Sequence, residues 1–192
     1  NHPGNAKNSD GDDAVLDLEI TANRPDCLSV IGIAREVATA YNLPFKKADA
    51  ISTFKLVTEE SSELAIALEE PNLCPRYAAT VVESTKTTSP KWMTYRLLSS
   101  GIRPINPIVD ITNYVLMELG HPIHAFDLDR LIDCKLRIRP SEAGESITTL
   151  DGEQRKLTKE MLVIADAEQA QAVAGVMGGA NSEVGTETNR VV

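Results

Sequence analysis

Residues 108–128 read IVDITNYVLMELGHPIHAFDL and hold two of the chain's three histidines, His121 and His124. In the first half, apolar side chains recur three or four positions apart, as they do along one face of a helix: Ile108, Ile111, Val115 and Leu119. Gly120 follows the last of them, and glycine commonly ends a helix because it adopts a left-handed backbone without steric cost. The first half therefore predicts a helix that ends at Gly120.

The second half predicts a sharp turn and a short strand. Pro122 cannot continue a helix, and it biases His121 towards an extended backbone. Residues 122–128 then alternate well enough for a short strand. Two polar residues, Thr112 and Asn113, interrupt the otherwise apolar helix. We expect polar side chains to gather near the joint of helix and strand, because sites are commonly built on loops that rigid elements hold.

The composition predicts a soluble protein whose core is filled by aliphatic side chains. Of 192 residues, 42% are hydrophobic and 4% aromatic, which suits one large domain or one domain with a smaller piece attached. The net charge of −9 argues against broad nucleic-acid binding and leaves room for a local basic face. Three cysteines without a CxxC pair indicate a reducing compartment and no zinc site. No apolar run approaches the roughly 20 residues of a spanning helix, and no signal peptide opens the chain. We therefore expect a cytoplasmic location and no membrane contact.

Residues 1–44 predict a small strand-plus-helix segment. Residues 15–20 alternate like a half-buried strand, and Ser29 is a good N-cap for a helix that ends before Pro44. Residues 45–53 have little periodicity and are interpreted as a linker. The strand-plus-helix segment is too small to fold well alone, so we expect it to dock on parts of a domain that are absent from this chain.

Residues 54–192 predict a mixed domain with more strand than helix. Ser89 and Pro90 open a helix as its N-cap and first helical residue, and Gly101 ends it. Apolar or alternating runs predict strands over residues 64–68, 77–82, 135–139, 161–165 and 171–176, and a hairpin over residues 146–157 around Asp151-Gly152. The predicted fold class is α+β: a mixed, multi-stranded, β-rich domain with several helices, preceded by the small strand-plus-helix segment.

The two central histidines do not form a recognisable metal or nucleophile motif. His121 and His124 make an HxxH pair, but Pro122 lies between them and no acidic ligand stands at the spacing of a zinc helix. No GxSxG or comparable elbow is present. On spacing alone, a structural histidine and a functional one fit equally well. The basic residues in and after the helix that follows Ser89 form either a solvated face or a patch that contacts phosphate.

Three glycines near the end of the chain allow two interpretations. Gly175, Gly178 and Gly179 either supply positive φ angles for a tight turn or let a ligand approach backbone N–H donors. No helix start follows them that would support a nucleotide-type phosphate loop. The residues alone thus predict a candidate pocket and do not name its substrate.

Several long motifs, in order along the chain, carry a resemblance to a known family. They are EITANRPDCLSVIGIAREVA, CPRYAATVV, SPKWMTYRLLSSGIRPINPIVDITNYVLMELGHPIHAFDLDRL, TLDGEQRKL and AGVMGG. From about Val15 onward, the chain closely resembles the β subunit of bacterial phenylalanyl-tRNA synthetase. The resemblance implies that residues 54–192 are the tRNA-editing domain and that residues 1–44 are the end of the domain before it.

In this family the editing domain hydrolyses tyrosine that is wrongly attached to tRNA(Phe), so the resemblance implies an ester hydrolase within a phenylalanine–tRNA ligase. A pocket that accepts phenylalanine cannot strongly reject the same ring with one added hydroxyl, whereas a second pocket that hydrogen-bonds the phenol discriminates the other way. The implied partners are tRNA(Phe), mischarged Tyr-tRNA(Phe) and the α subunit of a heterotetramer. The resemblance implies no metal or organic cofactor for editing, and it implies that the ATP and Mg²⁺ of the full synthetase bind outside this chain. The alternative is a non-catalytic module for tRNA contact or subunit assembly.

The resemblance also implies the residues of the site. They are His124, the editing-site histidine; Asn113, a polar pocket residue beside it; Thr112, a weaker neighbour; and Ala174 and Gly175, the small residues that shape the tyrosine pocket. His124 either activates or positions the water, and the terminal hydroxyl of the tRNA can take part of that role. His121 is expected to be structural.

One departure from the family concerns tyrosine selectivity. The family's Glu that recognises the phenol hydroxyl lies just after the apolar strand that follows the Gly-rich turn. Here the chain stops at Val192, on what resembles that strand, while Glu183 and Glu187 fall before it. We therefore expect an excised fragment that deacylates Tyr-tRNA poorly or not at all alone, although the intact subunit edits.

Overall fold

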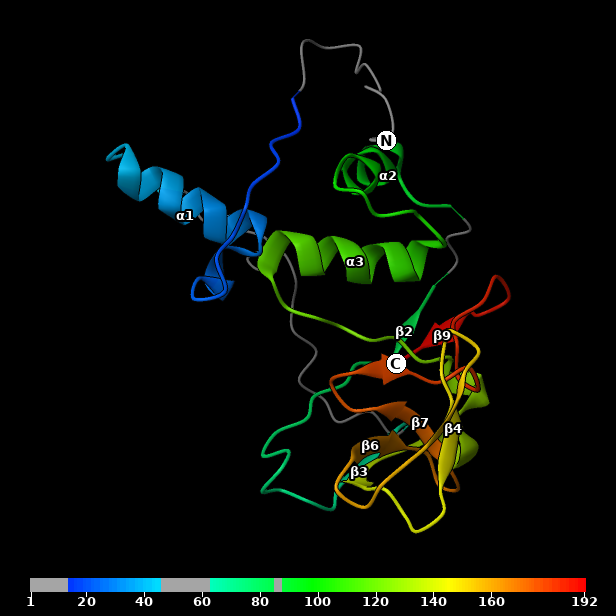
Figure 1. Cartoon of the computed structure of the whole chain (residues 1–192). Coiled ribbons are helices and arrows are strands. Elements are labelled where there is room, and N and C mark those ends of the chain that lie inside the picture. Colours follow the sequence, from blue (N-terminus) through cyan, green and yellow to red (C-terminus); the bar gives the residue numbers. More distant parts are fainter. Residues whose placement is uncertain (1–13, 46–62, 85–87) are drawn as a thin grey trace. The chain divides into compact units, whose positions relative to one another are not determined.

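The chain folds into a helical unit and a β-rich unit. The computed structural model describes residues 14–45, 63–84 and 88–192. By contacts within the chain, residues 14–45 and 88–123 form the first unit, and residues 63–84 and 124–192 form the second. Among the described residues, the three α-helices belong to the first unit and the strands to the second (Figure 1). The α+β class is confirmed.

The predicted domain boundaries are not tested by this grouping. The division into residues 1–44, 45–53 and 54–192 stays a prediction, and linker residues 46–53 lie outside the described ranges. Residues 88–123, which the prediction joined to the second part of the chain, make their contacts within the first unit.

The first helix is preceded by a short 3₁₀ turn, η1 (Pro25–Cys27), and runs as α1 (Val30–Ala40). Ser29 is its N-cap, as predicted, and its hydroxyl accepts a hydrogen bond from the Gly32 N–H at 3.1 Å. The strand predicted over residues 15–20 is wrong. These residues are mostly exposed and pair with none of the described strands, so their backbone is open to water and has no neighbouring strand that would define a sheet.

The helix α2 (Lys91–Ser99) begins one residue later than predicted. Pro90 occupies the N-cap position, and the Ser89 hydroxyl donates to the Asp110 carboxylate of the next helix instead of capping its own. At the other end, Gly101 has φ +79° as predicted, and the N–H of Ile102 donates to the carbonyl of Leu97. This six-to-one bond is the mark of a Schellman ending.

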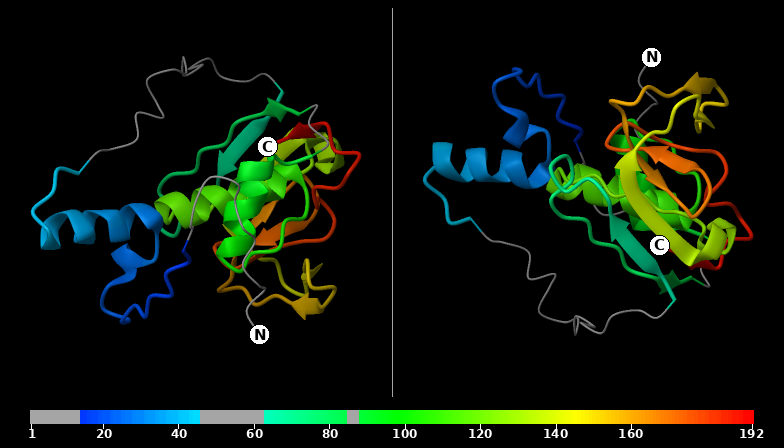
Figure 2. Two further views of the ribbon diagram at one scale, coloured as in Figure 1. Left: turned by 90° about the horizontal axis from the view of Figure 1, so that it is seen from above. Right: turned by 90° about the horizontal axis from the view of Figure 1, so that it is seen from below.

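The helix α3 (Pro107–Leu119) confirms the first half of the central stretch. The Asn106 side chain accepts from two backbone N–H groups at its start, and Gly120 adopts a left-handed backbone, φ +73°, at its end. A Cβ on Gly120 would lie 3.2 Å from the Ser29 Cβ, because the start of α1 packs against the end of α3 (Figure 2). Asp110, 1% exposed, accepts from Ser89 and from the Ile105 N–H, which fixes α2 to α3.

The second unit is built on a five-stranded mixed sheet in the order β1-β3-β6-β7-β8. These strands are β1 (Ala65–Leu68), β3 (Lys135–Pro140), β6 (Leu162–Ala165), β7 (Ala170–Val173) and β8 (Met177–Gly178). Two smaller sheets pair β2 (Val82–Glu83) with β9 (Arg190–Val191), and β4 (Ser146–Thr148) with β5 (Gln154–Lys156). Only β1 and β3 run parallel, and the other pairs are antiparallel.

Most predicted strands are confirmed, including the hairpin around Asp151-Gly152, but two more besides residues 15–20 are not. Of residues 77–82, only Val82 enters a strand. Residues 122–128 form a single bridge, from Asp127 to Val191, and the chain then enters the 3₁₀ turns η2 (Leu128–Arg130) and η3 (Ile132–Cys134). The Asp127 side chain accepts from the Asp129 N–H and so starts a turn where alternation predicted a strand.

Two clusters of side chains form the core of the second unit. The larger one gathers around the turn region after His124: Phe126, Leu128, Leu131, Leu136 and Ala172. The smaller one lies between the sheet and the β4–β5 hairpin: Ile147, Leu157, Val163, Ala165 and Ala170. The segment that follows His124 is therefore anchored by its own apolar side chains.

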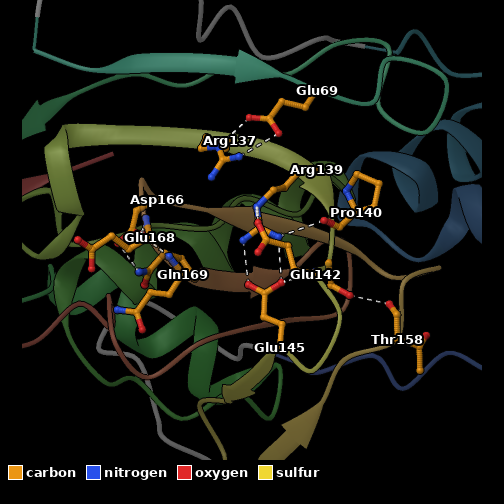
Figure 3. A network of polar contacts seen from close by, with 12 residues as sticks. Glu69, Arg137, Arg139, Pro140, Glu142, Glu145, Thr158, Asp166, Glu168 and Gln169 are labelled. Carbon is orange, nitrogen blue, oxygen red and sulfur yellow. Dashed lines mark hydrogen bonds and ion pairs between the residues drawn. The ribbon is translucent and has the colours of Figure 1, made fainter.

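A buried ion pair supports the same sheet (Figure 3). Arg139 on β3, 4% exposed, donates two hydrogen bonds to the Glu145 carboxylate, both at 2.9 Å. On the same strand, Arg137 pairs with Glu69 at a more exposed position. Hydrogen bonding from Arg139 lowers the pKa of Glu145 below its ordinary value, so the carboxylate stays charged in the folded protein.

Candidate functional site

His124 lies in the second unit, where the chain enters the core. Its ring packs edge-on against the ring of Phe126, with the centroids 4.6 Å apart and the planes at 80°. Phe126 is 2% exposed, and its backbone exchanges two hydrogen bonds with Val192, at 2.8 and 3.0 Å. The imidazole is therefore attached to a rigid part of the fold, while its side chain retains exposed surface.

The β7–β8 hairpin supplies the second neighbour of the imidazole. A Cβ built on Gly178 would lie 2.4 Å from Cε1 and 2.6 Å from Nε2 of His124, so the ring occupies the space that any other residue would fill. Gly178 pairs with Ala172 across the hairpin. His124 and this hairpin, which are far apart in sequence, thus touch one another.

The glycines of this region have different roles. Gly175 has φ +71° in the exposed turn between β7 and β8. It therefore supplies a positive φ angle for a tight turn, which is one of the two interpretations that the sequence left open. No atom lies within 4 Å of the Cβ position of Gly175, which leaves open space beside the turn. Gly178 and Gly179 have ordinary backbone angles and instead permit close packing, the latter with the Gln171 carbonyl oxygen 2.8 Å from its Cβ position.

The protonation state of the His124 imidazole follows from its surroundings. Burial lowers the pKa of His124 below its ordinary value, because protein around the ring disfavours the charged form. At neutral pH the ring is therefore uncharged, and one of its nitrogens carries a free lone pair. An uncharged imidazole with exposed surface can accept a proton from a water molecule.

The predicted site residues divide between the two units. His124, Ala174 and Gly175 belong to the second unit, where Ala174 is half-buried at the start of the β7–β8 turn. Thr112 and Asn113 belong to α3 in the first unit, and the Thr112 hydroxyl donates to the Val109 carbonyl at 2.8 Å. The approach of the Asn113 amide to the imidazole stays a prediction.

Two neighbours of His124 were missed by the sequence reasoning. Phe126 stands two residues after the histidine, and this spacing could have indicated a ring contact. Gly178 had been singled out as a glycine, but no signal in the sequence connects it with a side chain so distant along the chain. His121, expected to be structural, is exposed.

One group of possible metal ligands occurs among the described residues, in the first unit. Asp26, Cys27 and Glu36 lie close together. However, the Arg24 guanidinium pairs with both carboxylates, at 2.9 and 2.7 Å, and lowers the pKa of Asp26 to about 2. The arginine therefore already supplies the positive charge that a metal ion would bring.

Comparison with known proteins identifies the family to which the chain belongs. Residues 73–192 match the family model of the B3/4 domain. The chain belongs to the B3/4 domain family. The matched part of this B3/4 protein contains all the predicted site residues, from Thr112 to Gly175. Within the described ranges, no helix has the length and apolar character needed to cross a bilayer.

The curated relatives of this B3/4 protein confirm the resemblance noted from its motifs. It is 50% identical over 182 residues to the phenylalanine–tRNA ligase beta subunit of Carboxydothermus hydrogenoformans, covering 94% of this chain and 22% of the relative. The beta subunits of Oleidesulfovibrio alaskensis and Oceanobacillus iheyensis are 48% and 49% identical, each over 94% of this chain and 22% of the relative. The chain thus spans about a fifth of the length of the curated relatives that it matches.

Proposed function

We propose that this B3/4 domain is the editing region of a phenylalanine–tRNA ligase beta subunit, where it hydrolyses the ester of mischarged Tyr-tRNA(Phe). The observation that carries the proposal is the contact of an uncharged, partly exposed imidazole with the β7–β8 hairpin. That hairpin holds Ala174 and Gly175 in its turn, and the relatives named above are beta subunits of a phenylalanine–tRNA ligase, which supports the choice of ligase.

His124 supplies the proton transfer that ester hydrolysis needs. Water attacks the carbonyl carbon of the tyrosyl ester while an imidazole nitrogen takes one of the water's protons. The bond from that carbon to the ribose oxygen then breaks, and the ribose oxygen receives the proton. The products are free tyrosine and tRNA(Phe), with no net change at His124 and no metal or organic cofactor in the step.

The small turn provides room for the amino acid. Gly175 lies three residues from Gly178, which is at most about 10 Å of extended chain at about 3.3 Å per residue. The open space beside Gly175 is thus within reach of an ester held at the imidazole.

A second pocket is chemically necessary in such a ligase. An active site that accepts phenylalanine rejects tyrosine only weakly, because a hydrophobic pocket gains little discrimination against one added hydroxyl. Hydrolysis at a separate pocket removes the product of that error. In the assembled, cytoplasmic heterotetramer, the α subunit is the proposed partner, and ATP and Mg²⁺ bind outside this chain.

A non-catalytic role in tRNA contact is the second candidate, and a pair of rings on the first unit favours it. Trp92 is 55% exposed, Arg96 stacks over it at 5.5 Å, and Tyr114 packs edge-on at 5.2 Å. Exposed aromatic rings with a stacked guanidinium are suited to nucleotide bases.

The replacement His124→Ala in the assembled ligase tests the proposal. We expect release of tyrosine from Tyr-tRNA(Phe) to fall about 10²- to 10⁴-fold, as for loss of a general base, while charging with phenylalanine is unchanged. The matched control is His121→Ala, which removes an exposed histidine three residues away.

Two results would reject the editing role. One is tyrosine release at the parental rate in the His124→Ala ligase. The other is loss of subunit assembly or of phenylalanine charging in that variant, which would support the non-catalytic module. Gly175→Trp is a second test, because the indole should fill the open space beside the turn and the side chain is strained at φ +71°, so both effects should lower hydrolysis without affecting charging.

A further inference from the structure

We propose that Phe126 and Gly178 are positioning residues that hold the His124 ring in the orientation needed for hydrolysis. The inference rests on the proposed function, and it assigns a task to two residues that touch the imidazole. Neither residue is expected to contact the tyrosyl ester itself.

Phe126 provides a fixed contact for the ring. Its side chain is 2% exposed and belongs to the larger core cluster, with Leu128 and Leu136. Its backbone is held by the reciprocal hydrogen bonds with Val192. Because Phe126 cannot shift without disturbing this core, its edge-on contact at 4.6 Å limits where the imidazole can lie.

Gly178 provides the space in which the ring lies. The Cε1 and Nε2 atoms of His124 are closer to its Cβ position than any real Cβ allows, and the Leu150 side chain is 3.1 Å away. Gly178 is buried, and its carbonyl accepts from the Leu150 N–H at 3.0 Å, so the strand cannot retreat freely. An added methyl group must therefore move the imidazole, which is the end of a rotatable side chain.

The orientation of the ring matters because the proton transfer is short-range. A general base must lie within hydrogen-bond reach of the water that it activates, and a displacement of about 1 Å can reduce a rate about 10²-fold. A ring moved away from the hairpin is also less surrounded by protein. The position of the His124 ring and its protonation state should therefore change together.

Gly178→Ala separates this role from a structural one. The backbone angle of Gly178 is ordinary, so alanine is allowed there apart from the contact with the imidazole. Gly185→Ala is the matched control, because this glycine lies in the same unit, has an ordinary angle and has open space at its Cβ position.

The first measurement is an NMR titration of the imidazole Cε1–H signals in the 192-residue chain, with His124→Ala used to assign the resonance. We expect Gly178→Ala to raise the pKa of His124 towards its ordinary value and Gly185→Ala to leave it unchanged. An unchanged pKa and chemical shift of His124 in Gly178→Ala would overturn the proposal. This measurement does not require the chain to hydrolyse Tyr-tRNA(Phe).

The second measurement is tyrosine release by the assembled ligase. We expect Gly178→Ala to lower it about 10- to 10²-fold with phenylalanine charging intact, and Phe126→Leu to act in the same direction. A displaced imidazole with full hydrolysis would refute the positioning role. If the parental ligase releases no tyrosine, the proposed function fails instead. The titration alone then decides whether Phe126 and Gly178 hold the His124 ring in its orientation.

Discussion

Replacing Glu145 by Gln should destabilise the β-rich unit far more than the same change at Glu69. Both carboxylates pair with an arginine of β3 through two hydrogen bonds. They differ in exposure: the side chains of Arg139 and Glu145 are 4% and 13% exposed, and those of Arg137 and Glu69 are 24% and 38%. The two variants therefore test whether burial decides the effect of one ion pair.

The expected magnitude follows from what each change leaves behind. Glu145→Gln removes the charge opposite a buried guanidinium whose Nε already has no hydrogen-bond partner, and it also weakens the bond from the Glu142 N–H at 2.7 Å. Removing one partner of a buried pair costs about 3–5 kcal/mol. Glu69→Gln leaves Arg137 in reach of water, so its cost should be about 0–1 kcal/mol.

Urea unfolding followed through the amide NMR signals of β3 and β6 measures both free energies in the relevant unit. A difference of at least about 2 kcal/mol between the variants is expected from these ranges. Equal losses, or a larger loss for Glu69→Gln, would show that the burial of the Arg139 pair does not govern its contribution.

Two further changes should follow from the same structure. Because Arg139 lowers the folded-state pKa of Glu145, this carboxylate stabilises the fold above its unfolded-state pKa of about 4.3, and the gain is lost as the pH falls through the lowered folded value. A pH series of urea unfolding should show this loss below about pH 4, and a slope unchanged by Glu145→Gln would contradict it. Gly120→Ala should cost about 1–2 kcal/mol, since alanine is strained at φ +73° and its Cβ would crowd Ser29. Thermal unfolding measures the cost, with Gly185→Ala as the control, and an equal midpoint for the two variants would refute the argument.

Helix ends were the part of the fold that the sequence determined best. Ser29, Gly101 and Gly120 act through contacts within a few residues of their own position, so a local pattern contains the needed information. The N-cap of α2 was misplaced for the opposite reason. Ser89 bonds to Asp110, a residue of another helix, and no local rule predicts that competition.

Strands were predicted well only where a partner was available. Residues 135–139 and 161–165 alternate and also find neighbours, as β3 and β6. Residues 15–20 have a similar pattern but no described partner, and residues 122–128 are interrupted by the turn that Asp127 initiates. Alternation indicates that a segment can form a strand, and pairing decides whether it does.

The sequence indicated residues for the candidate site, whose roles stay a prediction, but it did not indicate their contacts. His124 could be selected from its motif, whereas its packing against Gly178 depends on how the β7–β8 hairpin meets a distant segment. The lowered pKa follows from that packing, so it too was outside the reach of sequence reasoning.

The reciprocal bonds between Phe126 and Val192 have a consequence for synthesis on the ribosome. Translation is vectorial, and the residues around His124 leave the exit tunnel well before Val192 does. Until then Phe126 lacks its backbone partner, and the Asp127 side chain lacks the hydroxyl of Thr188, 61 residues further along. The helices of the first unit can form as they emerge from the ribosome. The contacts around the imidazole form only later, because they join residues that are far apart in the sequence.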